Sequence, residues 1–556
     1  MSVTQRLFGT RWPRWTSDWL LSRGERGNDA AGVGTWSGGN AVRLIPHGVD
    51  YFAALDRELA DVGPGDLVLV AGWRFDGAQR LGPESTVASA LAGSASRGAL
   101  VRGLAWRSHP SWIVGSLQEN KSLARTVNRA GGRFLLDHRV RPLGSHHQKF
   151  VVIRRAADPD RDVAFVGGID LARSRADSVE HTGDPLPRDF AAVYGPTPAW
   201  HDVQLEIRGP AVRDVEEVFR ERWSDPAPMT RLPWHRLPDR VAGLPQQAGA
   251  LPPPRAAPPA RGRARVQLLR TYPARRPGYP FAPDGEFSVA RGFVKALQRA
   301  RRLVYLEDQY LWSAGVGTAL DAALRANRDL QVVAVCPRYA DQEGRLKVDP
   351  ALLGQGLALR ALSRSVRDRV TLLDIENDDG WPIYVHAKIS VIDDVWASVG
   401  SSNLNRRSWT HDTELTVAVL DDEHIESIEP IEPVDQTEAS DSSDPSDAPL
   451  LRSRDGARRF ARDTRVQLVR EHLGRPEGAD ADLEDPAQAV QALRDSAAAL
   501  DAWYDGGQVG PRPPGRLRRR VLQTATPWRR ALIAPVYNAV FDPDGRTLRQ
   551  RLRRRH

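Results

Sequence analysis

The feature that most constrains the fold of this chain is an internal duplication. Four pairs of stretches occur in the same order in its two halves: LVLVAGWRFD with LVYLEDQYLW, HHQKFVVI with VHAKISVI, GGID with GSSN, and HDVQLEIRGP with HDTELTVAVL. Apolar residues alternate within several of these stretches, as buried strands require. The duplication predicts two copies of one α/β fold, packed as a pseudo-dimer around a single shared site.

Each half carries a His-x-Lys pair, which is His147 with Lys149 in the first and His386 with Lys388 in the second. In a β-strand, residues i and i+2 face the same side, so each pair presents an imidazole beside an ammonium group. This combination suits attack on a phosphoryl centre, where catalysis depends on positioning and on charge stabilisation. We therefore expect both pairs to act on one phosphodiester.

The string HAKISVID, with GSSN and Glu414 after it, resembles the signature of the phospholipase D superfamily, whose members carry paired His-Lys-Asp motifs. The resemblance extends over roughly Leu67 to Leu420 and is strongest to the longer phospholipase D branch, through GGIDLARSRAD, WHDVQLEIRGP and YLEDQYLW. It implies two tandem phospholipase-D-like βαβ repeats, packed around mixed sheets that helices flank. It also implies a phosphodiesterase that works through a phosphohistidine.

The resemblance assigns roles to individual residues. His147 is expected to be the nucleophile and His386 the general acid, while Lys149 and Lys388 hold the non-bridging oxygens. Each histidine needs a carboxylate to fix its tautomer, and we expect Asp202 to serve His147 and Glu414 to serve His386. The remaining expected site residues are Asp393 and Asn403 as catalytic residues, and Gly168, Asp170, Gly400 and Ser401 as substrate-binding residues.

No metal and no cofactor is expected in this reaction, because two ammonium groups and an imidazolium already supply positive charge. Aromatic and arginine side chains near the motifs are candidates for lining the site, with none singled out: Trp73, Arg74, Arg175, Tyr310 and Trp409.

The first motif departs from the pattern of the superfamily. Arg154 stands seven positions after His147, where the second motif has Asp393 after His386. Either a nearby carboxylate (Asp158, Asp160 or Asp162) takes over the structural role of that aspartate, or the first half has lost activity. Asp170 and Asp308 likewise stand where the superfamily commonly has asparagine.

The pattern along the chain predicts six regions, with amphipathic helices alternating with strands inside both repeats. They are a basic and aromatic N-terminal segment (1–40), the first repeat (41–232), a Pro- and Arg-rich extended linker (233–265), the second repeat (266–420), an acidic disordered linker (421–450) and a basic helical C-terminal extension (451–556).

The amino-acid composition indicates which kinds of partner suit this chain. The net charge of +8 and a pI near 9.8 favour a polyanionic surface. A phospholipid membrane surface is expected to hold the substrate, with no obligate nucleic acid, and the chain is expected to be a monomer. The lone Cys336 excludes an intramolecular disulfide. The lack of a long apolar run predicts a cytoplasmic protein, peripheral at the membrane, and the basic C-terminal runs suit a membrane-facing arm as well as a solvated tail.

Three functions remain open at this point. The first is a phospholipase D that hydrolyses glycerophospholipids to phosphatidic acid and a head-group alcohol, or transfers the phosphatidyl group to another alcohol. The second is a cardiolipin-synthase-like phosphatidyltransferase. The third is a catalytically impaired protein that binds anionic lipid or nucleic acid, which Arg154 and the basic tail motivate.

Overall fold

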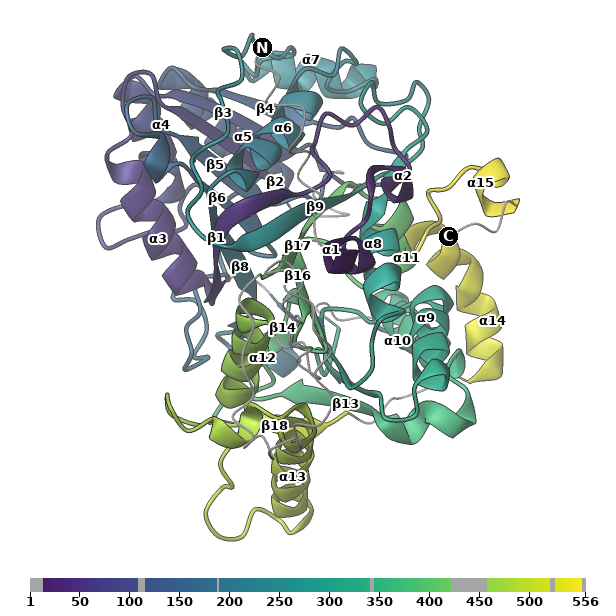
Figure 1. Cartoon of the computed structure of the whole chain (residues 1–556). Helices are drawn as coiled ribbons and strands as arrows, with labels where there is room; N and C mark the ends of the chain where they lie inside the picture. The colour runs from purple at the N-terminus through teal and green to yellow at the C-terminus, as the bar shows by residue number, and fades with distance from the viewer. Residues whose placement is uncertain are drawn as a thin grey trace, which may run out of the picture.

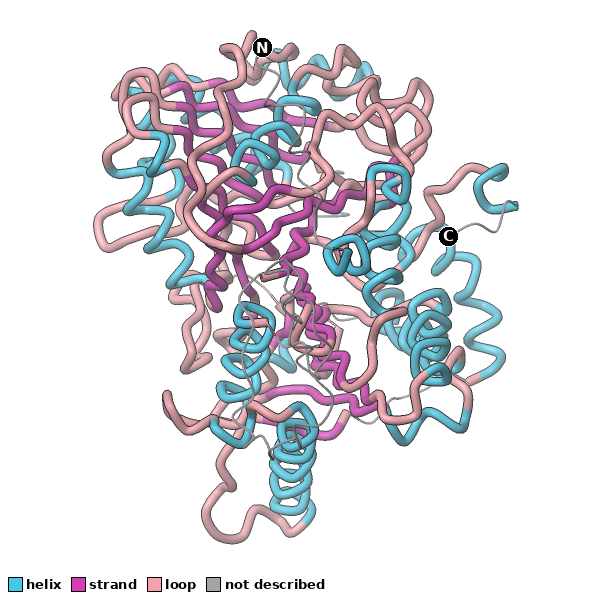
Figure 2. Tube along the Cα trace, viewed as in Figure 1, coloured by secondary structure: helices cyan, strands magenta, loops and turns pink. Residues whose placement is uncertain are grey.

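A long mixed β-sheet with helices on both faces runs through the molecule (Figures 1 and 2). The structure is a computed structural model, and it describes residues 14–108, 116–187, 190–340, 345–421, 458–520 and 526–552. The acidic linker predicted at 421–450 lies almost wholly outside the described residues, as do Arg11 and Trp12 of the N-terminal segment.

The first repeat contributes seven strands to this sheet. They are β1 (Ser37–Pro46), β2 (Leu67–Gly72), β3 (Leu100–Trp106), β4 (Arg133–Asp137), β5 (Phe150–Arg154), β6 (Val163–Gly167) and β8 (Val203–Arg208). Helices α3 (Gly48–Ala60), α4 (Val87–Ser96) and α5 (Leu117–Arg129) pack on one face, and α6 (Ala211–Trp223) packs on the other.

The second repeat contributes seven strands in matching places. They are β9 (Ala264–Tyr272), β11 (Leu303–Asp308), β12 (Gln331–Val335), β13 (Val370–Ile375), β15 (Lys388–Ile392), β16 (Trp396–Gly400) and β17 (Glu414–Leu420). Helices α8 (Ser288–Leu297) and α9 (Ala314–Ala326) cover one face, and α12 (Arg459–His472) and α13 (Pro486–Asp505) from the C-terminal extension cover the other.

Sheet order confirms the tandem repeat. From its outer edge, the first repeat runs β4-β3-β2-β5-β6-β8-β1, and the second runs β13-β12-β11-β15-β16-β17-β9. The two halves meet where β1 and β9 pair antiparallel, with Ser37 opposite Val266. The chain therefore forms one continuous sheet with an approximate two-fold relation at its centre.

The strands nearest the site are buried along their whole length. All six residues of β2 (LVLVAG) and all six of β11 (LVYLED) are buried. Each strand lies parallel to one neighbour and antiparallel to the other, and helices cover both of its faces. Near-continuous apolar runs are typical of such doubly covered strands. They give the site a rigid base.

The region between the repeats differs in part from the extended linker that we predicted. Residues Pro233–Val241 form helix α7, which Pro233 begins because its fixed φ suits the first helical turn. Only the residues from about 245 to 263 run without regular structure. They are fixed to the first repeat, for example by Arg220, whose guanidinium donates to the carbonyl of Pro252 at 2.8 Å.

The C-terminal extension packs against the second repeat and adds a strand to the sheet, unlike a solvated tail. Leu517–Arg519 form strand β18, which extends the sheet beside β13, and Arg518 forms an ion pair with Asp501 at 2.5 Å. Helix α14 (Pro527–Val536) and the short α15 (Leu548–Leu552) follow it. Within the described ranges, no helix is both long enough and apolar enough to cross a membrane.

Candidate active site

Both motif histidines lie just before matching strands rather than inside them. His147 and Lys149 precede β5, and His386 lies between β14 (Tyr384–Val385) and Lys388, the first residue of β15. The backbone N–H of His386 donates to the carbonyl of His201 at 2.7 Å, and that of His147 donates to Thr413 at 3.0 Å. Each motif histidine therefore makes its backbone bond to the other repeat, which is why the strand breaks there.

Each histidine also pairs with an acid from the other repeat. Nδ1 of His147 lies 2.9 Å from Oε2 of Glu414, and Nδ1 of His386 lies 2.6 Å from Oδ2 of Asp202. The pairing expected from sequence, which kept each acid with the histidine of its own half, is wrong. The cause is the backbone crossing, since β14 pairs in parallel with β7 (Trp200–His201), the two residues before Asp202.

The structure gives Asp202 and Glu414 matching places in the two repeats, although the strings around them align differently. The His-Asp strings at 201 and 411 suggest that Asp202 matches Asp412. However, Gly168 donates its N–H to the carbonyl of Val203, and Ser401 donates to Leu415, so Val203 and Leu415 are equivalent. Asp202 therefore matches Glu414, two residues beyond the apparent match.

This arrangement sets the tautomer of both rings. A carboxylate beside Nδ1 accepts a hydrogen bond from the Nδ1–H group, which keeps the proton on Nδ1 and leaves the lone pair on Nε2. Both side chains are largely buried, with 15% of His147 and 8% of His386 exposed. Nε2 of each ring is thus the atom available for nucleophilic attack or, once protonated, for donating a proton.

Burial disfavours charge on every member of the two pairs. Burial and the neighbouring Lys149 hold the pKa of His147 well below its usual value, and burial with Lys388 does the same for His386. Burial raises the pKa of Glu414 to about 8, with Asp412 adding to the effect, and raises that of Asp202 to about 6. His147 also contributes to the shift at His386, which places both rings in one electrostatic environment.

The two lysines are held by backbone carbonyls of the motifs. Nζ of Lys149 donates to the carbonyl of His147 at 3.0 Å, and Nζ of Lys388 donates to that of His386. Burial lowers the pKa of Lys388 to about 8, and Lys149 opposes its charge as well. Cations that repel one another in a dry site favour binding of an anion, such as a phosphate group, that neutralises both.

Three residues expected to bind substrate lie against the two acids or against the residue next to one of them. An added Cβ on Gly168 would lie 2.1 Å from Oδ1 of Asp202, and one on Gly400 would lie 2.4 Å from the carbonyl of Leu415. Only glycine permits these close approaches. The hydroxyl of Ser401 donates to Oε2 of Glu414 at 2.5 Å, so it orients that carboxylate.

Asp170 and Asn403 occupy matching places with different surroundings. Asp170 accepts the backbone N–H groups of Trp73 and Arg74 and lies 3.5 Å from Nζ of Lys149. As a carboxylate it holds this lysine and would repel a phosphate, so it fits a supporting role better than the expected substrate contact. Asn403 is buried, and its Oδ1 has no hydrogen-bond partner among the described residues.

Asp308 provides the corresponding support in the second repeat. Its carboxylate accepts N–H groups from Tyr310, Leu311 and Leu404, each at 2.8 Å. Each repeat therefore uses one aspartate to hold its loops, although Asp170 lies in the loop after β6 and Asp308 is the last residue of β11.

Asp393 lies away from the histidines, in the turn after β15. Its carboxylate accepts the backbone N–H groups of Arg301, Arg302 and Leu303 at 2.6–2.9 Å. It therefore fixes the start of β11 to the β15–β16 turn. The role of Asp393 is therefore structural. It does not lie at the active site, where we expected it as a catalytic residue.

Arg154 replaces this contact in the first repeat with a buried ion-pair cluster. Its guanidinium bonds to Asp162 at 2.7 Å and to Glu216, and Oδ1 of Asp162 accepts the N–H of Arg155 at 2.5 Å. Of the three candidate carboxylates, Asp162 thus braces the β5–β6 connection. His147 and Lys149 keep their places in the site, so Arg154 gives no reason to regard the first repeat as inactive.

Of the residues that surround His386, sequence reasoning named Arg175 among the candidates for lining the site and did not name Trp200 or Gln309. The ring of Trp200 lies 4.9 Å from that of His386, the guanidinium carbon of Arg175 lies 3.7 Å from the Trp200 ring, and Gln309 accepts from Lys388 at 3.3 Å. Trp200 immediately precedes His201 and Asp202, so the string WHD was the available signal.

A separate group of His47, His181, His201 and Glu471 lies beside Asp202 and has the composition of a metal-ligand set.

Two family models match the two halves. The one described as "Phospholipase D" matches residues 117–242, and the one described as "Cardiolipin synthase, PLD-like domain" matches residues 293–431. Among curated proteins, the chain is 22% identical to phospholipase D alpha 1 of Zea mays over 53% of this chain and 47% of that protein. It is 24% identical to phospholipase D alpha 3 of Arabidopsis thaliana over 52% of this chain and 46% of that protein.

The chain thus spans about half the length of these two relatives. Among solved structures, the phosphatidylserine synthase of Haemophilus influenzae has a TM-score of 0.47 and 13% identity, over 69% of this chain and 82% of that one.

Proposed function

Because the chain belongs to the phospholipase D superfamily, whose homologues imply a phosphodiesterase-type enzyme, we propose that it is a phospholipase D acting on glycerophospholipids. The observation that carries this proposal is the crossed geometry, in which each repeat supplies one histidine and the acid that orients the other. Two imidazoles with Nδ1 fixed, flanked by two lysines, match what a two-step displacement at phosphorus requires.

The first step forms a bond between Nε2 of His147 and phosphorus, and breaks the bond between phosphorus and the head-group oxygen. Nε2–H of His386 gives its proton to that oxygen, so the alcohol leaves neutral. Lys149 and Lys388 face the non-bridging oxygens. The negative charge of the phosphodiester raises the pKa of His386 from its lowered value, which lets His386 carry the proton at neutral pH.

The second step reverses these roles. Water attacks the phosphoryl-histidine, its proton passes to Nε2 of His386, and the bond between phosphorus and His147 breaks. The products are phosphatidic acid and the regenerated imidazoles. An alcohol in place of water gives a transphosphatidylation product by the same steps.

A phospholipid surface is the proposed partner, and helix α14 supports it. Trp528, Leu532 and Val536 recur every four residues and are 65%, 71% and 51% exposed. Arg529 and Arg530 lie beside them, and the opposite face packs through Ile533 and Ala534 beside Trp312 and Leu353. An exposed apolar stripe beside arginines is typical of a helix that rests in the headgroup region of a bilayer.

The decisive assay measures choline release from phosphatidylcholine liposomes, with and without EDTA in the buffer. Release is expected from the native chain and is expected to be lost in both His147→Ala and His386→Ala. His235→Gln is the matched control, because His235 is a buried histidine in α7 and belongs to neither His-x-Lys motif. No release from any phospholipid by the folded native chain would contradict the proposal.

A second candidate is phosphatidyl transfer to a lipid alcohol, which the description of the second family model favours. It uses the same two histidines and differs only in the acceptor. Adding phosphatidylglycerol to the liposomes distinguishes the two functions. Cardiolipin formed in preference to phosphatidic acid would assign the transferase reaction.

A further inference from the structure

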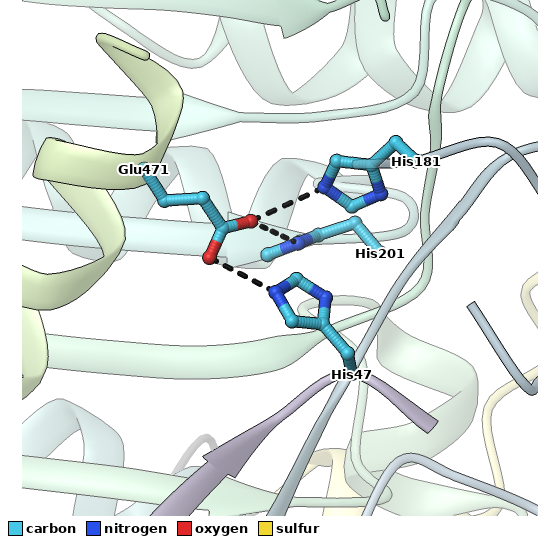
Figure 3. A group of neighbouring side chains, drawn as sticks. All are labelled: His47, His181, His201 and Glu471. Carbon is cyan, nitrogen blue, oxygen red and sulfur yellow. Dashed lines mark hydrogen bonds and ion pairs between the residues drawn. The ribbon is translucent and has the colours of Figure 1, made fainter. Parts of the chain in front are cut away.

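Three histidines converge on the carboxylate of Glu471 outside the phosphodiesterase site (Figure 3). His47 follows β1, His181 lies in the loop between β6 and β7, His201 ends β7, and Glu471 comes from α12. All four residues are buried. The group therefore joins the C-terminal extension to three separate segments of the first repeat.

The spacing of the donor atoms suits a tetrahedral ion. Nε2 of His47, Nε2 of His181 and Nδ1 of His201 lie 3.1, 3.2 and 3.5 Å from oxygens of Glu471. With metal–ligand bonds of about 2.0–2.2 Å, neighbouring ligand atoms of a tetrahedral zinc site lie roughly 3.3–3.6 Å apart. All four ligand atoms lie within 4.8 Å of one another.

The opposite nitrogens of two of these rings also face carboxylates. Nδ1 of His181 lies 3.4 Å from Oδ2 of Asp177, and Nε2 of His201 lies 2.7 Å from Oε2 of Glu307. A neutral imidazole has one N–H, so it can satisfy only one of two flanking carboxylates. An outer carboxylate that accepts the N–H of a ligating histidine is the usual support of a metal site.

We propose that the chain binds one divalent transition-metal ion, with zinc the best fit, through Nε2 of His47, Nε2 of His181, Nδ1 of His201 and the carboxylate of Glu471. Nitrogen and oxygen donors in tetrahedral spacing suit zinc. Four protein ligands close the coordination sphere, so the ion is structural and takes no part in the reaction.

The neighbouring group of His201, Glu307 and His472 is less suited to hold an ion. Glu307 already accepts hydrogen bonds from both histidines, at 2.7 and 2.8 Å, and from the hydroxyl of Tyr305 at 2.5 Å. With its oxygens occupied, Glu307 supports His201 from outside the metal site.

The ion would fix the segment that presents Asp202 to His386. His201 directly precedes Asp202, and the backbone N–H of His47 donates to the carbonyl of Asp202 at 3.0 Å. His47 itself has a φ of +68°, which is unfavourable for a residue other than glycine and requires support from its surroundings. The ligands are therefore positioning residues for the acid of the second histidine.

The competing arrangement is a buried proton in place of the ion. Against the effect of burial, Glu307 and Glu471 raise the pKa of His201 to about 10, so a protonated ring between two carboxylates also balances charge. The two arrangements differ in composition, because only one contains a metal. Metal content distinguishes them without reference to phosphodiesterase activity.

The test measures the metal content of the full-length chain after dialysis against Zn²⁺ and then against metal-free buffer, with the melting temperature recorded before and after removal by 1,10-phenanthroline. About one zinc per chain is expected, and its removal is expected to lower the melting temperature. His181→Gln and Glu471→Gln are each expected to weaken zinc binding at least about tenfold. His235→Gln, which removes a buried histidine elsewhere, is expected to retain the metal.

Crystals of the native chain grown with Zn²⁺ keep the inference testable where a variant does not fold. An anomalous peak at the zinc edge is expected among the four side chains. The inference is overturned if the folded native chain takes up no stoichiometric zinc, if both ligand variants bind it as the native chain does, or if the peak lies elsewhere. Absence of zinc binding with retained choline release would leave the proposed function intact. Zinc binding in the absence of choline release would leave the metal site intact.

Discussion

Nδ1 of His147 lies 2.9 Å from Oε2 of Glu414, although the two residues come from different repeats and are 267 positions apart. The reciprocal contact joins His386 to Asp202 across 184 positions. Neither repeat can therefore assemble a complete histidine and acid pair by itself. The crossing explains why the two copies must pack in one arrangement, since any other would separate both imidazoles from their carboxylates.

The first prediction concerns this crossing. Glu414→Gln should change the NMR signals of the His147 imidazole and leave those of His386 nearly unchanged, while Asp202→Asn should do the reverse. Both variants should lower kcat by about 10²–10⁴-fold, because an amide does not stabilise the imidazolium that forms during proton transfer. Selective isotope labelling of histidine provides the measurement, and perturbation of the histidine in the same repeat as the substituted acid would contradict the crossing.

The second prediction separates the roles of the two histidines. A phosphatidyl ester of p-nitrophenol has a leaving group that departs without a proton, so it does not require the general acid. His386→Ala should therefore form the phosphohistidine readily from this ester, whereas His147→Ala should not. Mass spectrometry of quenched samples should locate the adduct on His147.

A matched comparison with a choline ester completes this experiment. With choline as the leaving group, both alanine variants should be inactive, because His147→Ala lacks the nucleophile and His386→Ala cannot protonate the departing alkoxide. An adduct on His386 in the His147→Ala variant would reverse the assigned roles.

The sequence was sufficient to predict the tandem repeat and both His-x-Lys pairs, because short local strings contain that information. The crossed pairing could not be found in this way. It depends on long-range backbone bonds, such as those from His386 to His201 and from His147 to Thr413. The His-Asp strings were misleading as well, since their apparent match is two residues away from the structural one.

Buried charge was the other feature beyond the reach of sequence patterns. Arg154 looked like a defect in the motif, yet its side chain finds carboxylates on two other segments, at Asp162 and Glu216. The four proposed metal ligands extend from His47 to Glu471 and show no recognisable spacing. Folding of the first repeat brings the three histidines together, and packing of α12 adds Glu471.

The third prediction is a pH dependence. The pKa of His147 lies well below its usual value through burial and Lys149, so the nucleophile stays unprotonated as pH falls through about 6.5. The acidic limb of the kcat/KM profile should therefore lie below that pH. Lys149→Gln removes a neighbouring cation, which favours the imidazolium, so it should move this limb to higher pH as well as lower the rate.

Asp412→Asn provides a control of opposite sign. The Asp412 carboxylate favours the charged form of His147, so its neutralisation should lower the pKa further and move the acidic limb to lower pH. Shifts in the same direction in both variants would show that another group governs the limb.

The fourth prediction concerns Asp393. Asp393→Ala leaves three backbone N–H groups at 301–303 without their acceptor. The free energy of unfolding should fall by about 1–3 kcal/mol, measured by urea denaturation. Asp378→Ala is the control, because that side chain is 80% exposed, and should have little effect. Activity per folded molecule should persist, and its loss at unchanged stability would instead place Asp393 in the reaction.

The fifth prediction concerns the lipid surface. Replacing Trp528 and Leu532 of α14 together by serine should weaken binding to anionic vesicles at least about tenfold, because each side chain contributes up to about 1.5–3 kcal/mol when its apolar surface is fully buried. Cosedimentation with phosphatidylglycerol vesicles measures the change. Val509→Ser removes an apolar side chain that is 82% exposed outside this helix, and should leave binding unchanged.

The basic residues contribute separately to this binding. Arg518 and its neighbours are part of strand β18 and pair with Asp501 and Glu376, so truncation from Arg516 would damage the sheet. Arg529→Gln with Arg530→Gln is the better test, and should reduce binding mainly at low ionic strength, because exposed charges are screened by salt. If the apolar double variant binds vesicles as the native chain does, while the arginine variant does not, α14 attracts the membrane by charge alone and its apolar stripe does not enter the bilayer.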